Sequence, residues 1–230
     1  MIVTESYPPD VNGVAHCALH TARHLTRRGH DVLVVAPAPS ADTDLPTDDP
    51  APVVHVASLP LPRYPQVRVA WRSRKLAVSL AAHRPDVVHL SSPFVLGARA
   101  MNAAARRGIP SVAIYQMDVA GYARAYLGAG QRAACRRIRA IHTAADLILA
   151  PSSASVRDLG ARGIPRVRLW PRGVDTERFQ PDRRDEALRR SLVPDGELLV
   201  GVRGPARPGE ARWPACRSVR ATRCATGCRG

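Results

Sequence analysis

Polar side chains follow several of the short apolar runs in this chain, and their types and spacing could do chemistry. In chain order they are Asn12, which precedes Gly13, then Ser91, Ser92, Gln116 and Asp118, with Tyr122 and Tyr126 shortly after. Because the carboxyl ends of parallel strands meet at one edge of a doubly wound sheet, where ligands bind, we expect these residues to face one crevice. Amide, carboxylate and hydroxyl groups can hydrogen-bond sugar hydroxyls, and tyrosine rings can stack on a sugar. Taken singly, each is equally a cap or a turn residue.

The stretch ESYPPDVNGVA, after the first apolar run, is the part of this set closest to a phosphate-binding loop. Gly13, preceded by Asn12, would let the backbone approach a phosphate or a sugar at the start of the first helix. The stretch is not the G-x-G-x-x-G fingerprint, so it does not indicate dinucleotide binding. The alternative is that Gly13 is a turn glycine and nothing more.

Histidines recur every fourth residue of the first expected helix, at His16, His20 and His24. That spacing can hold a metal from one helix face, but arginines share the face and no carboxylate or cysteine completes a site. The opposite face is apolar, so we interpret the histidines as a solvated polar face. The cysteines form no CxxC pair with a matching partner, and no metal site is expected.

Apolar runs alternate with amphipathic stretches up to Gly201, a pattern typical of a parallel α/β sheet. Strands are expected at residues 1–5, 31–37, 53–59, 86–92, 111–116, 147–152 and 167–171. Helices are expected at residues 14–30, 72–84, 96–108, 131–145 and 152–163. Several of these helices end in arginine followed by glycine, which suits a left-handed last residue and the helix dipole. The predicted fold is a Rossmann-like parallel sheet with helices on both faces.

Three regions follow from this pattern: a domain over residues 1–170, a linker with the first elements of another unit over 171–201, and a tail over 202–230. The tail has almost no apolar periodicity and is expected to be disordered. It also holds seven arginines against one acid, and so contributes +6 to the net charge of +15. Lys75 is the only lysine. The basic charge alone is therefore a weak indication of nucleic-acid binding, which we do not expect.

The order of motifs resembles the retaining GT-B glycosyltransferases, specifically the actinobacterial-type mannosyltransferases that extend glycolipids such as phosphatidylinositol mannosides. The resemblance rests on IVTESYPPDVNGVA, LTRRGHDVLVVAP, PDVVHLSSPFVLG, YQMDVAGYARAY, LAPSSASVRDL and RGVDTERFQP, which together cover nearly all of residues 1–201. It implies a hexosyltransferase that needs no metal or cofactor. The transferred hexose would be mannose, the donor GDP-mannose, and the acceptor a lipid-linked or other glycan. The present residues would be the N-terminal, acceptor-side half of a GT-B fold.

The resemblance also assigns roles to single residues. Asn12 and Gly13 fall in the loop near the donor phosphate and the acceptor, with Ser92 and Tyr122 as further substrate contacts. Gln116 stands where many relatives carry histidine, so it would orient a sugar hydroxyl but could take up no proton. Asp118 is the nearest carboxylate, and Arg172 opens the RGVD motif that leads into the second domain.

The family continues after LLVG with a segment of the form YVGRLAPEK, whose Arg and Lys grip the departing diphosphate. Codons can be chosen for residues 202–211 such that the same DNA, translated in the frame one base further on, encodes YVGRLAPEK. We therefore interpret the tail as a frameshift product, with a genuine disordered basic arm as the alternative, and expect the 230-residue chain to be inactive. The alternatives are a non-catalytic remnant or an isolated acceptor-binding domain.

No secretory signal and no membrane span of about 20 apolar residues is seen, so a cytoplasmic protein is expected. A glycolipid acceptor would place it on the inner face of the plasma membrane. The candidate contacts with that anionic surface are Arg72, Arg74, Arg106 and Arg107.

Overall fold

The computed structural model describes residues 1–192 except 41–42, 44, 46, 62–63, 71–73, 92, 117–130 and 172. It divides the chain into two compact units, Met1–Arg172 and Gly173–Gly230, which are described separately.

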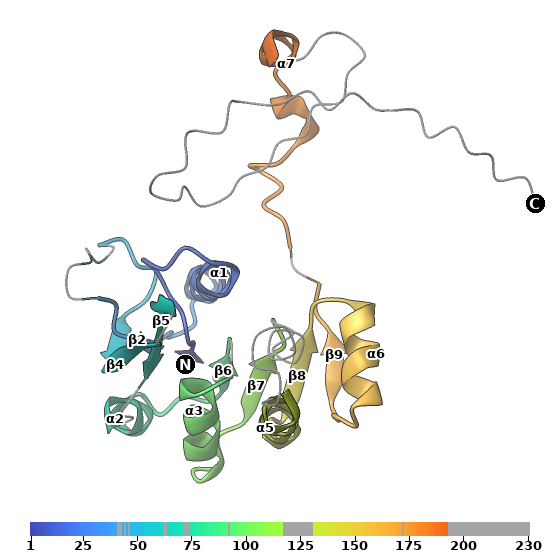
Figure 1. Cartoon of the computed structure of the whole chain (residues 1–230). Helices are drawn as coiled ribbons and strands as arrows, with labels where there is room; N and C mark the ends of the chain where they lie inside the picture. Colours follow the sequence, from blue (N-terminus) through green and yellow to red (C-terminus); the bar gives the residue numbers. More distant parts are fainter. Residues whose placement is uncertain are drawn as a thin grey trace, which may run out of the picture. The chain divides into compact units, whose positions relative to one another are not determined.

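A sheet of seven parallel strands forms the centre of the first unit (Figure 1). Its strand order is β3-β2-β1-β6-β7-β8-β9. The strands are β1 (Ile2–Val3), β2 (Val34–Pro37), β3 (Val53–Val56), β6 (Val88–Leu90), β7 (Ser111–Ile114), β8 (Leu147–Ala150) and β9 (Val167–Leu169). Val, Ile, Leu and Ala dominate the strands, and the inner strands are largely buried, as strands covered on both faces require. The edge strands β3 and β9 are partly exposed. Each of the seven strands lies within a strand expected from the sequence, so the fold prediction is confirmed.

Helices cover both faces of the sheet, as the composition of the core shows. They are α1 (Gly13–Arg27), α2 (Arg74–His83), α3 (Leu96–Ala105), α5 (Gln131–Ala144) and α6 (Ser153–Ala161). Ala18 and Ala22 of α1 pack with Ile2 and Val34 in one apolar cluster. Buried residues of α2, α3, α5 and α6 join Val3 in the other. Because successive strand residues point to opposite faces, α1 lies on one face and the other four helices lie on the opposite one.

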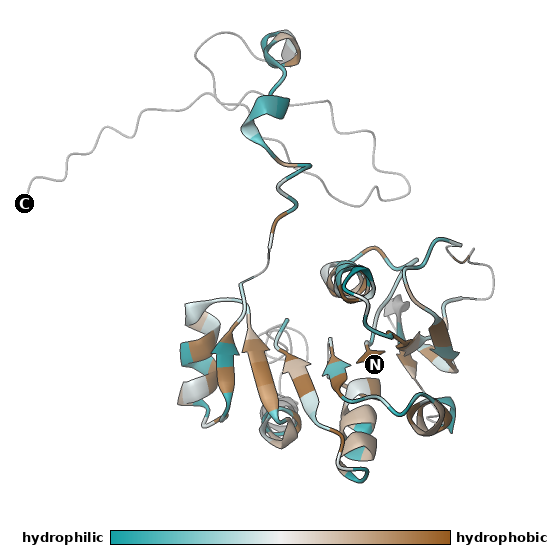
Figure 2. Ribbon diagram, turned by 180° about the vertical axis from the view of Figure 1, so that it is seen from behind, coloured by the Kyte–Doolittle hydropathy of each residue, from teal (hydrophilic) through white to brown (hydrophobic). Residues whose placement is uncertain are grey.

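The helices end where the sequence predicts. Gly29, Gly108 and Gly163 follow α1, α3 and α6 with φ angles of 82°, 67° and 70°, a region that side chains with a Cβ rarely adopt. Figure 2 shows the apolar character of the strands beside the mixed character of the helices. The histidines of α1 are exposed, as expected for a polar face.

A two-stranded antiparallel hairpin, β4 (Ser58–Leu61) with β5 (Tyr64–Ala70), was not expected from the sequence. Pro60 and Pro65 lie inside it, and proline usually argues against a strand because it lacks the N–H donor. Arg68 ties the hairpin to the sheet, since its Nε donates to Ala38 O, directly after β2, at 2.7 Å. Its Nε also donates to Ser58 Oγ within the hairpin at 2.8 Å.

The second unit is described over residues 173–192, which hold the 3-10 helix η2 (Pro181–Arg183) and α7 (Glu186–Leu192). Both lie in the region, 171–201, to which the sequence analysis assigns a linker and the first elements of another unit. The remainder of that region, 193–201, and the tail at 202–230 lie outside the described residues.

Candidate functional site at the carboxyl edge of the sheet

The order of the sheet reverses between β1 and β6, which are hydrogen-bonded neighbours. From β1 the chain passes through α1 to β2 on one side, and from β6 it passes through α3 to β7 on the other. The loops that leave these strands therefore diverge, and ligands of doubly wound sheets bind in the crevice that results. This reversal places the candidate site at the carboxyl ends of β1, β6 and β7.

The loop from β1 to α1 is organised around Asn12. Its Oδ1 accepts hydrogen bonds from Val14 N and Ala15 N, both at 3.0 Å, and thereby caps α1. Its Nδ2 donates to Ser6 Oγ at 2.7 Å, and Ser6 Oγ donates to Asp10 Oδ2 at 2.6 Å. Asn12 is thus an N-cap whose amide also fixes the preceding loop.

Gly13 begins α1, and neither backbone nor packing explains why glycine stands there. Its φ lies outside the left-handed region, and an added Cβ would meet nothing within 4 Å. It borders a hollow of about 490 Å³ along the same loop. The hollow is lined by Pro8, Pro9, Asp10, Val11, Asn12, Gly13, His16 and Leu19. Open space beside an exposed glycine is compatible with the close approach of a ligand.

Glu5, directly after β1, joins the two sides of the crevice, and the sequence analysis did not single it out. Its Oε1 accepts hydrogen bonds from Phe94 N at 3.1 Å, Val95 N at 2.6 Å and Gly97 N at 3.0 Å. These N–H groups open α3, where helix N–H groups have no intrahelical partner. Burial raises the pKa of Glu5, although the N–H groups of residues 94–97 act in the opposite direction. The one signal in the sequence was a carboxylate at the end of the first expected strand.

Gln116 follows β7, and its Nε2 donates to Ser91 O, at the end of β6, at 2.7 Å. A carbonyl partner fixes the orientation of the amide, because only the nitrogen can donate. Gln116 Oε1 and Ser91 Oγ are both buried and have no hydrogen-bond partner among the residues that the structure describes. The carboxyl edge therefore holds a buried acceptor and a buried hydroxyl with hydrogen-bonding capacity left over.

The structure thus brings three of the predicted site residues, Asn12, Gly13 and Gln116, to one edge of the sheet. The others, Asp118, Ser92, Tyr122 and Arg172, lie outside the described residues. Among the residues that the structure describes, no group of three His, Cys, Asp or Glu side chains could hold a metal ion.

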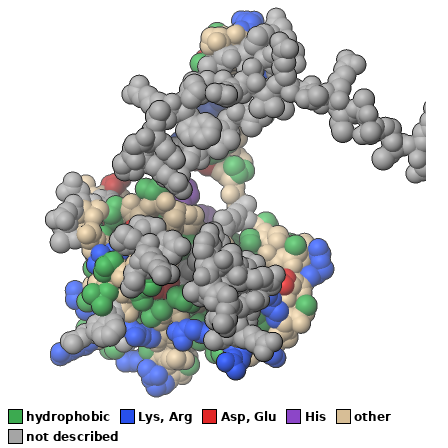
Figure 3. Space-filling view, viewed as in Figure 1, with side chains coloured by type: hydrophobic (Ala, Val, Ile, Leu, Met, Phe, Trp, Pro, Cys, Tyr) green, Lys and Arg blue, Asp and Glu red, His purple; other side chains and the backbone are tan. Residues whose placement is uncertain are grey.

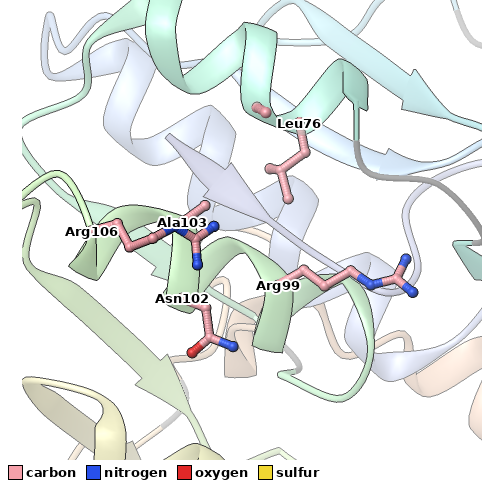
Figure 4. A pocket seen from close by; sticks show the side chains of 6 residues that line it. Leu76, Arg99, Asn102, Ala103 and Arg106 are labelled. Carbon is pink, nitrogen blue, oxygen red and sulfur yellow. The ribbon is translucent and has the colours of Figure 1, made fainter.

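Basic side chains gather away from this edge. Figure 3 shows Lys and Arg along the lower rim of the first unit, and the exposed Arg74, Arg106 and Arg107 belong to α2 and the end of α3. A cavity of about 200 Å³ lies between these two helices (Figure 4). It is lined by Leu76, Ala77, Arg99, Asn102, Ala103 and Arg106. Within the described part of the chain, no helix is long and apolar enough to cross a membrane.

Comparison with known proteins gives related enzymes. The chain is 42% identical over 210 residues to a GDP-mannose-dependent alpha-mannosyltransferase of Mycobacterium tuberculosis, covering 90% of this chain and 56% of that protein. A GDP-mannose-dependent alpha-mannosyltransferase of Mycolicibacterium smegmatis is 43% identical over 213 residues, with the same coverage. The chain therefore spans about half the length of these curated relatives.

The fold has a counterpart among solved structures. A sucrose-phosphate synthase from Thermosynechococcus elongatus matches with a TM-score of 0.59 at 14% identity, over 85% of this chain and 53% of that chain. At that identity the likeness concerns the fold alone, a Rossmann-like half of a GT-B architecture. The family model of Glycosyltransferase Family 4 matches residues 11–178, which is most of the chain. This chain accordingly belongs to Glycosyltransferase Family 4.

Proposed function

We propose that this chain supplies the acceptor-side half of a glycosyltransferase that moves mannose from GDP-mannose to a lipid-linked or glycan acceptor with retention of configuration. The observation that carries the proposal is the 42% identity, over 90% of the chain, to a GDP-mannose-dependent alpha-mannosyltransferase. The hydrogen-bonding groups at the carboxyl edge support it, because neutral acceptors and hydroxyls suit a sugar.

Gln116 has the role of orienting a sugar hydroxyl. Its Nε2 is engaged by Ser91 O, so Oε1 is left to accept a hydrogen bond from the ligand. An amide cannot accept a proton near neutral pH, so Gln116 is not the general base. We assign the acid–base role to Asp118, the carboxylate nearest to Gln116 along the chain.

The acceptor is held along the loop from β1 to α1 in this proposal. The hollow beside Asn12 and Gly13 is large enough for part of a glycan, and its lining mixes proline, leucine and polar groups. Ser92, Tyr122 and Arg172 are the further proposed substrate contacts. Cations that meet the charge of the departing diphosphate belong to the donor-side half, where each such donor contributes about 10²–10³ in rate.

The membrane surface is the proposed location of the acceptor. Arg74, Arg106 and Arg107 are exposed, and the segments of α2 and α3 contain no acidic residue. Each cation near an anionic surface contributes about 1 kcal/mol to binding. Arg72 completes the proposed set. Co-sedimentation with liposomes should rise with the content of anionic lipid, and indifference to that content would contradict the contact.

A paired transfer assay tests the proposed activity. Labelled GDP-mannose and a membrane-lipid extract are supplied to the 230-residue chain and to a version in which the frame after Gly201 is shifted by one base and continued. We expect transfer with the continued version and none with the 230-residue chain. Sequencing the DNA across the Gly201 codon tests the frameshift directly.

A Gln116 variant tests the site within the continued version. Gln116→Leu removes the acceptor atom at similar volume and should reduce kcat/KM about tenfold to a hundredfold, as loss of a buried hydrogen bond predicts. Asp158→Asn, at a half-buried position of α6 where the carboxylate pairs with Arg162, is the control and should leave transfer unchanged. Equal transfer by both variants would refute the role of Gln116. Equal activity of the 230-residue chain and the continued version would refute the proposal that transfer requires the donor-side half.

A further inference from the structure

The cavity between α2 and α3 has a polar lining that comes from one face of α3 (Figure 4). This polar lining consists of Arg99, Asn102 and Arg106, which are three and four residues apart and so lie on one side of the helix. The apolar lining consists of Leu76, Ala77 and Ala103. The cavity measures about 200 Å³, and a water takes about 30 Å³ of liquid volume, so a group the size of several waters fits.

Two of the polar side chains have donors that the protein does not use. Neither the side-chain amide of Asn102 nor the guanidinium of Arg106 makes a hydrogen bond or an ion pair with any residue that the structure describes. Both side chains are exposed, so a ligand can reach them. An arginine offers five N–H donors and an asparagine two, and neither guanidinium nor amide N–H groups can accept a proton at neutral pH. The cavity therefore presents donors that suit an anion.

The structural role expected of an arginine at the end of a helix belongs to a neighbour of Arg106. Arg107 Nη1 donates to Ala103 O at 3.2 Å, and so satisfies a carbonyl in the last turn of α3. Arg99 is also engaged by the protein, because its Nη1 donates to Ala70 O at 3.0 Å. Arg106 has no such contact with a described carbonyl, and it lines the cavity instead.

The charge around the cavity also favours an anion. Residues 50–117 contain eight arginines and Lys75 against a single acid, Asp86. No described residue in the lining is acidic, so Arg99 and Arg106 share the cavity without a carboxylate. Like charges on one helix face repel each other, and a bound anion would relieve that repulsion. Among anions, phosphate matches the planar fork of a guanidinium, which can donate to two of its oxygens at once.

We propose that the cavity between α2 and α3 binds a phosphate group, which accepts hydrogen bonds from the guanidinium of Arg106 and the side-chain amide of Asn102, with Arg99 adding positive charge. The phosphate is either free phosphate or the phosphodiester of a lipid headgroup, since both have the same oxygens. The inference goes beyond the proposed function. Because α3 ends before β7 begins, Arg106 lies toward the amino edge of the sheet, away from the candidate site at the carboxyl edge.

Titration of the 230-residue chain with inorganic phosphate, and separately with glycerophosphoglycerol, tests the site. Chloride keeps the ionic strength constant, so general screening does not change during the titration. The side-chain amide resonances of Asn102 should shift saturably. Arg106→Gln should weaken the affinity about tenfold, because hydrogen bonds between charged groups are the strong ones. Asn102→Ala should weaken it by a smaller factor, followed by the backbone amide of Ala103.

Arg84→Gln is the matched control. Arg84 is exposed and directly follows the last turn of α2, whereas Leu76 and Ala77 lie in the first turn. The substitution removes the same charge from the same basic region and should leave the affinity nearly unchanged. Since Arg84, Asn102 and Arg106 are all exposed, the three variants should fold.

Two outcomes would overturn the proposal. The first is equal weakening by Arg84→Gln and Arg106→Gln, which would reduce the binding to general electrostatic attraction. The second is the absence of saturable shifts with both probes. Neither a sugar donor nor a glycan acceptor is used, so a failed transfer assay leaves this result independent.

Vesicles of phosphatidylcholine, with and without phosphatidylglycerol, distinguish the two sources of phosphate. If the source is a lipid headgroup, glycerophosphoglycerol should bind, and Arg106→Gln should reduce co-sedimentation with the anionic vesicles more than Arg84→Gln does. If the source is free phosphate, only inorganic phosphate should bind, and the two variants should co-sediment alike.

Discussion

Two carboxylates hold backbone N–H groups at opposite edges of the same sheet, and their surroundings affect them in opposite ways. Glu5 follows β1 at the carboxyl edge, and burial raises its pKa. Asp146 precedes β8 at the amino edge, and hydrogen bonds from Ser111 N at 2.8 Å and Ser111 Oγ at 3.0 Å lower its pKa. Asp146 is exposed, so its charge stays hydrated while it makes these bonds.

The opposite pKa shifts distinguish Asp146, whose ionised form the fold favours, from Glu5, whose ionised form it disfavours. Asp146 ties the start of β7 to the start of β8 with little loss of hydration, and Arg166 nearby favours its charge. Glu5 makes more hydrogen bonds yet its ionised form is disfavoured, because desolvation outweighs them. A carboxylate whose charge stabilises the fold should behave like Asp146, whereas Glu5 contributes through its hydrogen bonds rather than through its charge.

The largest expected effect comes from removing the Glu5 side chain. Glu5→Ala leaves the N–H groups of Val95 and Gly97 without their acceptor, and unsatisfied donors cost about 1–3 kcal/mol. Urea unfolding of the chain should show this loss of free energy. Glu5→Gln, which keeps an acceptor, should lose far less at neutral pH. If both variants lost the same amount, the charge itself would stabilise the fold and the contrast with Asp146 would fail.

The next largest loss of unfolding free energy is expected from removing the Asn12 cap, a neutral group at the same edge as Glu5. Asn12→Ala removes the acceptor for Val14 N and Ala15 N and the donor to Ser6 Oγ, and should cost about 1–2 kcal/mol. Ser152→Ala is the matched control, because Ser152 caps α6 with one backbone bond, from Ser155 N, and shares one more bond with Ser155 Oγ. Its loss should be smaller, about 1 kcal/mol or less, in the same unfolding measurement. A larger loss for Ser152→Ala would show that the loop around Asn12 contributes no stability.

The sheet and its helices could be predicted because their signals are local. Apolar runs of Val, Ile and Leu marked the strands, and arginine followed by glycine marked the helix ends. The hairpin β4–β5 was missed because Pro60 and Pro65 argue against strands, and its stability depends on Arg68 reaching Ala38. The partners of Glu5 lie about ninety residues away along the chain, so no local pattern could reveal them. Gln116 was placed at the correct edge, but its bond to Ser91 required the structure.

A smaller effect is expected from neutralising Asp146. Asp146→Asn keeps a side-chain oxygen but removes the charge that Ser111 and Arg166 favour, and should cost about 0.5–1 kcal/mol at neutral pH, since solvent screens an exposed charge. Glu5→Gln at neutral pH should be neutral or stabilising. Thermal unfolding of both variants checks the sign. A stabilising Asp146→Asn would contradict the assignment of Asp146 as a structural carboxylate.

The finest test is the pH dependence of these two variants, because the two pKa shifts have opposite signs. The pKa of Glu5 is raised above 4.5, so its contribution to stability is fully present below that pH and is lost as pH rises through the folded pKa. The pKa of Asp146 is lowered below 3.8, so its contribution is present above that pH and is lost as pH falls through the folded pKa. The free energy of unfolding of the unaltered chain minus that of Glu5→Gln should therefore fall from acidic to mildly alkaline pH. The free energy of unfolding of the unaltered chain minus that of Asp146→Asn should rise as the pH leaves the acid range and then stay constant. The total rise should be less than about 1 kcal/mol, because Asp146 is exposed. Parallel profiles would mean that the two edges shift the pKa of a carboxylate in the same direction, and the contrast between Glu5 and Asp146 would fail.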